Sequence, residues 1–142
     1  AAPFGNDEGS DALWELSDLL RRRPKADLTN YPASLLMKLY HLPFCPPKGE
    51  TKDELEAQRG ITLGDRDTLE QLRRTDRVIV ALALAQVKIT GELSKQLYEL
   101  ALRSLERLGK LKSIGVTVRC SVELLAEERS DLETYASSVP LV

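Results

Sequence analysis

The chain has 142 residues, of which 42% are hydrophobic and 30% are charged, and its formal net charge is -2. A chain of this length can bury a substantial core as one domain and needs no metal or dense disulfide framework to fold. Because the net charge is close to zero, the chain is not a polycation, and binding to nucleic acid through a large overall positive charge is excluded. The longest strongly apolar run, residues 78–85, is too short to span a bilayer, so we expect membrane contact to be peripheral at most.

The N-terminal residues are rich in Gly, Asn and acidic side chains, which predicts a disordered tail over residues 1–9 and a single domain over residues 10–142. Ser10 is a candidate N-cap for a helix over about residues 11–22, which Pro24 ends. Apolar side chains recur in this segment at spacings of three and four, as in an amphipathic helix. These positions are Leu13, Leu16 and Leu20.

Two shorter helices are expected next. Pro32 suits the first turn of a helix, because its missing N–H would be unpaired there in any case. The proline-rich segment at residues 42–47 that follows can form neither a helix nor a central strand. Thr51 and Glu54 then have the spacing of a capping box, which predicts a short helix that ends at Gly60.

The apolar run at residues 78–85 is the candidate centre of the fold, and another helix start lies before it at residues 65–67. The alanines of the run favour a helix, whereas its Val-Ile-Val start would also suit a buried strand. Beyond the run, Thr90 is expected to cap a helix over about residues 91–108, with Gly109 as its C-terminal stop.

The last third of the sequence fits two patterns. Apolar residues alternate with polar ones near residues 113–123, which is the period of a strand. The same apolar residues also fit helical steps of three and four, and Ser121 or Ser130 could cap a helix there. We therefore predict an all-α fold, a compact bundle of four to six helices with a proline-rich loop. The alternative is an α+β fold with a strand near residues 113–123.

The residue types that commonly carry catalysis or bind metals are sparse. His41 is the only histidine, and no second histidine or cysteine stands at a metal-ligand spacing from it. The glycines are scattered as stops and turns, so no loop of the kind that cradles phosphate is present. The many carboxylates accompany Arg and Lys residues on polar helix faces. We therefore predict that the protein is not an enzyme and has neither a metal site nor a cofactor.

The cysteines and the N-terminal residues suggest a compartment. Cys45 and Cys120 allow one disulfide, and Cys45 lies in a stiff proline-rich segment that a disulfide could fix. The chain begins Ala1-Ala2-Pro3 without a methionine, as a chain does after removal of a leader. We accordingly predict a Cys45–Cys120 disulfide and a secreted or organelle-lumen location.

The candidate partner-binding residues are one tryptophan and two basic clusters. Trp14 lies beside the main stripe of its helix, and tryptophan is typical of interface hot spots. Each basic cluster could meet an acidic surface. On a helix, Arg103 and Arg107 would share a face, because they are four residues apart. The full predicted set is Trp14, Leu13, Leu20, Arg21, Arg22, Arg23, Arg103 and Arg107.

These features predict a non-catalytic subunit that docks on a larger protein or a membrane-associated complex and stabilises it. The expected partner is a protein and not a nucleic acid. The alternative is a secreted ligand or effector that binds a receptor or a cytoskeletal protein. The sequence does not fix the oligomeric state.

Overall fold

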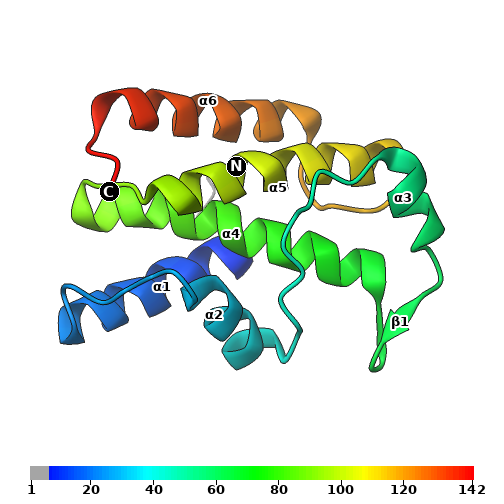
Figure 1. Ribbon diagram of the computed structural model, residues 1–142, viewed down its shortest axis with the longest axis horizontal. Helices are drawn as coiled ribbons and strands as arrows, with labels where there is room; N and C mark the ends of the chain where they lie inside the picture. Colours follow the sequence, from blue (N-terminus) through cyan, green and yellow to red (C-terminus); the bar gives the residue numbers. More distant parts are fainter. Residues whose placement is uncertain (1–6) are drawn as a thin grey trace.

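A computed structural model describes residues 7–142, and within this range it contains six helices and one short hairpin (Figure 1). The predicted all-α helical bundle is therefore confirmed, and only the hairpin departs from it. In chain order the elements are α1 (Asp7–Arg22), α2 (Tyr31–Tyr40), α3 (Lys52–Ala57), β1 (Thr62–Leu63), β2 (Arg66–Asp67), α4 (Thr68–Thr90), α5 (Lys95–Ser113) and α6 (Val122–Ser138).

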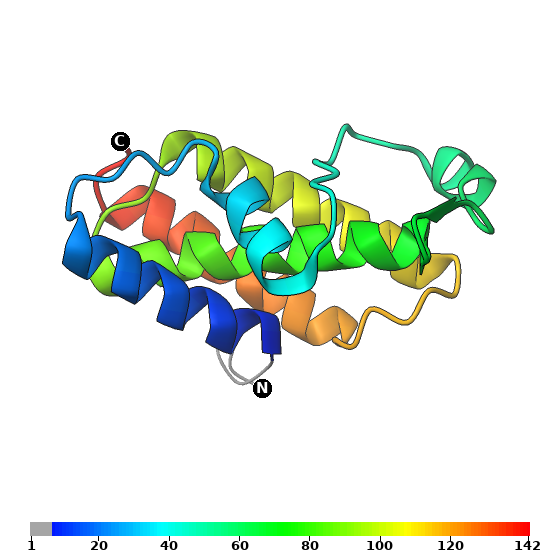
Figure 2. The same ribbon diagram turned by 90° about the horizontal axis from the view of Figure 1, so that it is seen from below.

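Helix α4 forms the centre of the bundle. It lies between α1 and α5 in two perpendicular views (Figure 1, Figure 2). Its residues 78–86 are all buried, so the apolar run is a helix and not a strand. A helix with apolar residues on every side is stable only when neighbours surround it. Here α1, α2, α5 and α6 all pack against α4.

Side-chain caps fix where the helices begin. The Thr51 hydroxyl accepts a hydrogen bond from the Glu54 amide at 3.1 Å, as the predicted capping box requires. Asp67 and Ser121 cap α4 and α6 in the same way, by accepting from the amides of Leu69 and Leu124.

The predicted bounds of α5 are wrong at both ends. Ser94, and not Thr90, caps this helix, because Gly91 adopts a left-handed conformation (φ 71°) that ends α4. Gly109 does not end α5, which continues to Ser113. A glycine inside a helix weakens it by only about 1 kcal/mol, and the buried Leu111 beyond it offsets this.

The first helix begins earlier than the sequence suggests. Residues 1–6 of the predicted tail lie outside the described residues, whereas Asp7–Gly9 already belong to α1. Ser10 is therefore inside the helix and is not its N-cap. The missed signal is Glu8, a carboxylate that is buried against Arg73 of α4 at 3.2 Å.

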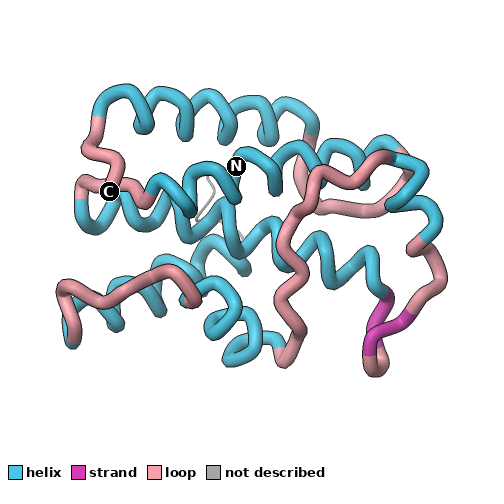
Figure 3. Tube along the Cα trace, viewed as in Figure 1, coloured by secondary structure: helices cyan, strands magenta, loops and turns pink. Residues whose placement is uncertain are grey.

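The α+β alternative is wrong, since residues 114–121, all of them described, form a turn and a loop before α6 (Figure 3). Gly115 and Arg119 have φ of 90° and 59°, and a strand requires negative φ. The hairpin at residues 62–67 was not predicted. Its turn contains Gly64 at φ 65°, and the Gln71 amide of α4 holds it by donating to the Leu63 carbonyl at 2.8 Å.

Candidate functional site

Trp14 is the most exposed large apolar side chain among the described residues, with 76% of its surface accessible. The packed face of α1 is centred on Ala12 and Leu16, which are fully buried. Successive residues of a helix are about 100° apart, so the side chain two residues after Ala12 points almost directly away from the bundle. Burying an indole inside a partner removes a large apolar area from water, and such tryptophans often anchor interfaces.

The basic run at the end of α1 extends this surface. Arg21, Arg22 and Arg23 are all exposed. Arg21 follows Trp14 by seven residues, close to two helical turns, so both lie on the same face of α1. Asp18 pairs with Arg21 at 2.8 Å and with Arg22 at 3.0 Å. We call this set, Trp14 with Arg21, Arg22 and Arg23, the α1 surface.

The other predicted residues lie apart from the α1 surface. Leu13 and Leu20 are half-buried and pack against the core, so they support α1 rather than extend its free face. Arg103 is exposed, but it belongs to α5, which lies on the other side of α4 from α1 (Figure 2). The structure therefore does not bring Arg103 next to Trp14.

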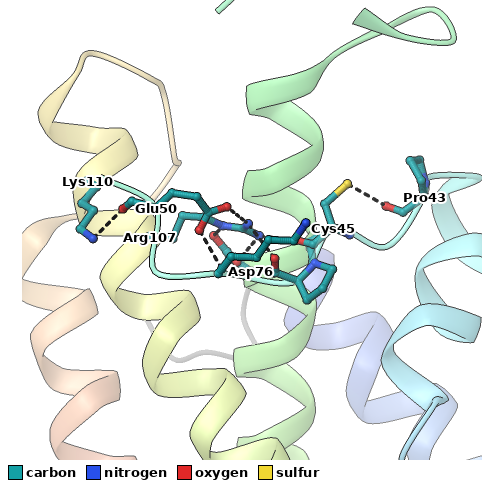
Figure 4. A network of polar contacts seen from close by, with 9 residues as sticks. Pro43, Cys45, Glu50, Asp76, Arg107 and Lys110 are labelled. Atoms are coloured by element: carbon teal, nitrogen blue, oxygen red, sulfur yellow. Dashed lines mark hydrogen bonds and ion pairs between the residues drawn. The ribbon is translucent and has the colours of Figure 1, made fainter. Parts of the chain in front are cut away.

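Arg107 is not a surface residue, which corrects the prediction that it contacts a partner. Its side chain is 2% exposed and uses all five of its N–H donors inside the protein (Figure 4). Nε and Nη2 donate to the two carboxylate oxygens of Asp76 at 2.9 and 2.8 Å. The remaining donors bond the carbonyls of Cys45 and Pro46 and the Glu50 carboxylate, at 2.6, 3.3 and 2.9 Å. No donor is left for a ligand.

This arrangement fixes the proline-rich loop on the bundle. Besides the contacts of Arg107, the Lys110 ammonium donates to the Glu50 carbonyl at 2.7 Å. The loop has little regular hydrogen bonding of its own, so side chains of α5 satisfy carbonyls that secondary structure would otherwise pair. Asp76 supplies the charge that compensates Arg107 in the interior. Burial raises the pKa of the Asp76 carboxyl to about 7, and Arg107 opposes that rise.

Two further ion pairs are buried along α4. Arg73 is 1% exposed and donates to Glu8 of α1 and to Glu70 of its own helix. Arg77 donates to both oxygens of Glu128 of α6, at 2.7 and 3.1 Å. Unpaired buried charges would be strongly destabilising, so these pairs fix how α1 and α6 sit on α4.

Sequence reasoning missed this network, although a signal was available. Asp76 occupies a position at helical spacing from Leu69, Leu72 and Ile79, which are all buried. A charged residue at a core-facing position needs a buried partner of opposite charge. Which basic residue fills that role depends on the packing of α5 against α4, and spacing along the chain does not reveal it.

Glu70 should make the free energy of unfolding depend on pH in the acidic range. The hydrogen bond from Arg73 holds the pKa of Glu70 below its ordinary value of 4.5, although partial burial opposes this. A carboxyl with a lowered pKa stabilises the folded state above its unfolded pKa, and this contribution is lost as the pH falls through the folded pKa. We expect Glu70→Gln to lower the free energy of unfolding at neutral pH. Urea titrations should show the difference from wild type shrinking below pH 4.5.

The exposed carboxyl of Glu99 provides the control for that series. Glu99→Gln is expected to leave the free energy of unfolding near that of wild type throughout. A Glu70→Gln effect that stays constant with pH would show that the carboxylate charge is not the cause.

Both cysteines, which lie in the described part of the chain, are free, so the predicted disulfide is not formed. Cys45 lies beside Asp76 and Arg107, whereas Cys120 lies beside Arg77 and Glu128. Residues 76 and 77 point about 100° apart on α4, so the two thiols occupy different sides of this helix.

The thiols should react slowly. Burial raises the pKa of both cysteines, and only the thiolate attacks an alkylating reagent. We expect slow alkylation of the folded protein at neutral pH and rapid labelling of both cysteines in urea. Without reductant, intact-mass spectrometry should give the mass of the fully reduced chain. A mass lower by two hydrogens would contradict the structure on this point.

No group of three or more His, Cys, Asp or Glu side chains within residues 7–142 is arranged to hold a metal ion. His41 is exposed and follows α2 in a left-handed conformation. In the same range no helix is both long and apolar enough to cross a bilayer.

Comparison with known proteins gives one distant relative. No family model matches the sequence, and no solved structure matches it. The protein YfeS of Escherichia coli K12, described only as uncharacterised, is 27% identical over 106 residues. The aligned region covers 75% of this chain but 41% of YfeS, so the chain spans less than half the length of that relative. The name of YfeS states no activity.

Proposed function

We propose that the protein is a non-catalytic binding module that docks on a larger protein, or on a membrane-associated complex, and stabilises it. The observation that carries this proposal is the exposure of Trp14 on the side of α1 opposite the core. Exposed apolar residues are common singly, but a tryptophan with 76% of its surface in water is unusual unless a partner covers it. The proline-rich loop, which Arg107 and Lys110 hold on the bundle through hydrogen bonds to Cys45, Pro46 and Glu50, suits a structural role.

The basic run at the end of α1 should affect the association rate and the salt dependence of this docking. Exposed arginines at an interface rim accelerate association with an acidic partner and make binding sensitive to salt. The Asp18 carboxylate already compensates part of this charge, so the remaining attraction is modest. A secretory or organelle-lumen location stays a prediction.

The test uses affinity capture from an extract of the protein's own source. The partner retained by the immobilised protein is identified by mass spectrometry, and its affinity is measured at several salt concentrations. Replacing Arg21, Arg22 and Arg23 with Ala should weaken binding at low salt and flatten its salt dependence. The control is Lys52→Ala, an exposed cation on α3. Unchanged low-salt affinity in the triple variant would rule out a role for the basic run.

A further inference from the structure

A pocket of about 510 Å³ lies between the proline-rich loop, α3, the β1–β2 hairpin and α4. Its lining includes the apolar side chains of Phe44, Ile61, Leu63 and Leu72. Leu72 is buried, whereas Ile61 and Leu63 are 49% and 42% exposed, so the apolar surface continues from the base of the pocket to its mouth. Exposed apolar side chains that cluster at a hollow often mark a contact site. We call this site the hairpin pocket.

The walls of the hairpin pocket are fixed by hydrogen bonds. Arg107 holds the proline-rich loop on one side of it. On the other side, the Thr68 hydroxyl donates to the Ile61 carbonyl at 2.6 Å, and the Gln71 amide donates to the Leu63 carbonyl at 2.8 Å. The donors of Arg107 and Thr68, which line the pocket, are thus bonded inside the protein. The pocket is therefore preformed, and its base offers apolar contact rather than hydrogen bonds.

The charged side chains around the hairpin pocket are mainly acidic. Asp53 and Glu54 of α3 are exposed, and neither forms an ion pair with any of the residues that the structure describes. Glu56, on the same helix, pairs with Arg59 at 2.6 Å. Lys48 also lines the pocket and offsets one negative charge. The rim therefore carries a net negative charge, which suits an apolar group that is accompanied by cations.

The α1 surface is complementary to the hairpin pocket. Its exposed indole, Trp14, accompanies three arginines, and Asp18 compensates only part of their charge. A cavity of about 510 Å³ is within the range that holds drug-sized ligands, so it can accommodate an indole. Trp14 points away from its own bundle, and α3 and the hairpin lie at the end opposite most of α1 (Figure 1, Figure 2). The indole can therefore reach this pocket only on another molecule.

We propose that Trp14 of one molecule inserts into the hairpin pocket of a second copy of this chain, with the arginines of the α1 surface beside Asp53 and Glu54 of that copy. The contact joins two different surfaces, so a pair keeps a free Trp14 and a free pocket, and further copies can add to it. One indole and a few neighbours bury less than the roughly 1,200 Å² of stable complexes, so the association is weak. A partner that covers Trp14, as in the proposed docking, would separate the copies.

Sedimentation velocity of the wild-type protein at increasing concentration tests this proposal. The mean mass should rise above the 15.8 kDa of one chain as the concentration approaches about 1 mM, and added salt should reverse the rise. Trp14 is the only tryptophan in the sequence, so its fluorescence emission should move to shorter wavelength as the indole leaves water. A protein that remains monomeric at about 1 mM in low salt would overturn the proposal.

Two variants test which surfaces meet. Trp14→Ala and Leu63→Ser each change an exposed side chain, so both should fold, which a urea titration verifies. Each variant alone should self-associate about tenfold more weakly than wild type, or less still. A mixture of the two should form pairs, because the Leu63→Ser protein supplies the indole and the Trp14→Ala protein supplies the intact pocket. These pairs should not grow further, since their remaining surfaces are both altered.

Val122→Ser is the matched control, because it changes an exposed apolar side chain on α6, and it should associate as wild type does. Failure of the two variants to pair when mixed, or undiminished association of Leu63→Ser, would refute the assignment of the hairpin pocket. The proposal shares Trp14 with the proposed docking but does not depend on it. A wild-type protein that captures a partner through Trp14 yet never self-associates would overturn this proposal and leave the docking proposal intact.

Discussion

Replacing Asp76 or Arg107 with Ala is expected to lower the free energy of unfolding by about 3–5 kcal/mol, measured by urea titration. Each substitution leaves a buried polar group without its partner, since both side chains are at most 2% exposed. Arg107→Ala also removes the donors for the carbonyls of Cys45 and Pro46. This is the largest stability effect that the structure leads us to expect.

The double variant separates pairing from simple loss of packing. Asp76→Ala with Arg107→Ala removes both charges, so it should be less destabilised than the sum of the two single variants, with a coupling of about 1–3 kcal/mol. Arg103→Ala is the matched control, because it changes an exposed arginine on the same helix, and its effect should stay within about 0.5 kcal/mol. An Arg107→Ala protein as stable as the control would show that Arg107 is not buried and paired.

Trp14→Ala should weaken binding of the captured partner by about 30-fold or more, which corresponds to about 2 kcal/mol. The free energy of unfolding should change by no more than about 0.5 kcal/mol, because the indole makes little contact with the bundle. The measurement is a calorimetric dissociation constant for the purified partner, combined with a urea titration of the unbound protein.

Val122→Ala is the matched control for this prediction, since it removes an exposed apolar side chain from α6. Its partner affinity should equal that of wild type. Equal affinities for Trp14→Ala and Val122→Ala would show that Trp14 does not anchor the interface. A large loss of stability in Trp14→Ala would show that the indole belongs to the core instead.

Much of the fold could be predicted from local signals. Helices begin at the three predicted starts, which are Pro32, Thr51 and Ser121. The apolar run at residues 78–85 is buried in the centre of the bundle, as predicted. The errors arose where two local signals competed. Gly91 and Ser94 lie within four residues of Thr90, and only the packing of α5 on α4 decides which residue begins the helix.

The candidate site was less predictable than the fold. Exposure of Trp14 follows from its position relative to Ala12 and Leu16, which the helical period supplies. The burial of Arg107 depends instead on Asp76, thirty-one residues earlier in the chain. Two arginines four residues apart, Arg103 and Arg107, look alike in sequence, yet one faces water and the other the interior. Pairings between distant residues have no local pattern, so only the structure reveals them.

Native mass spectrometry of the protein from its own source, produced as wild type and as Trp14→Ala, tests the docking proposal most directly. We expect the wild-type protein to be found in a larger assembly and the Trp14→Ala protein to be released from it as a free chain. A wild-type protein found only as a free chain, or equal incorporation of both proteins, would contradict the proposal that the α1 surface docks on a partner.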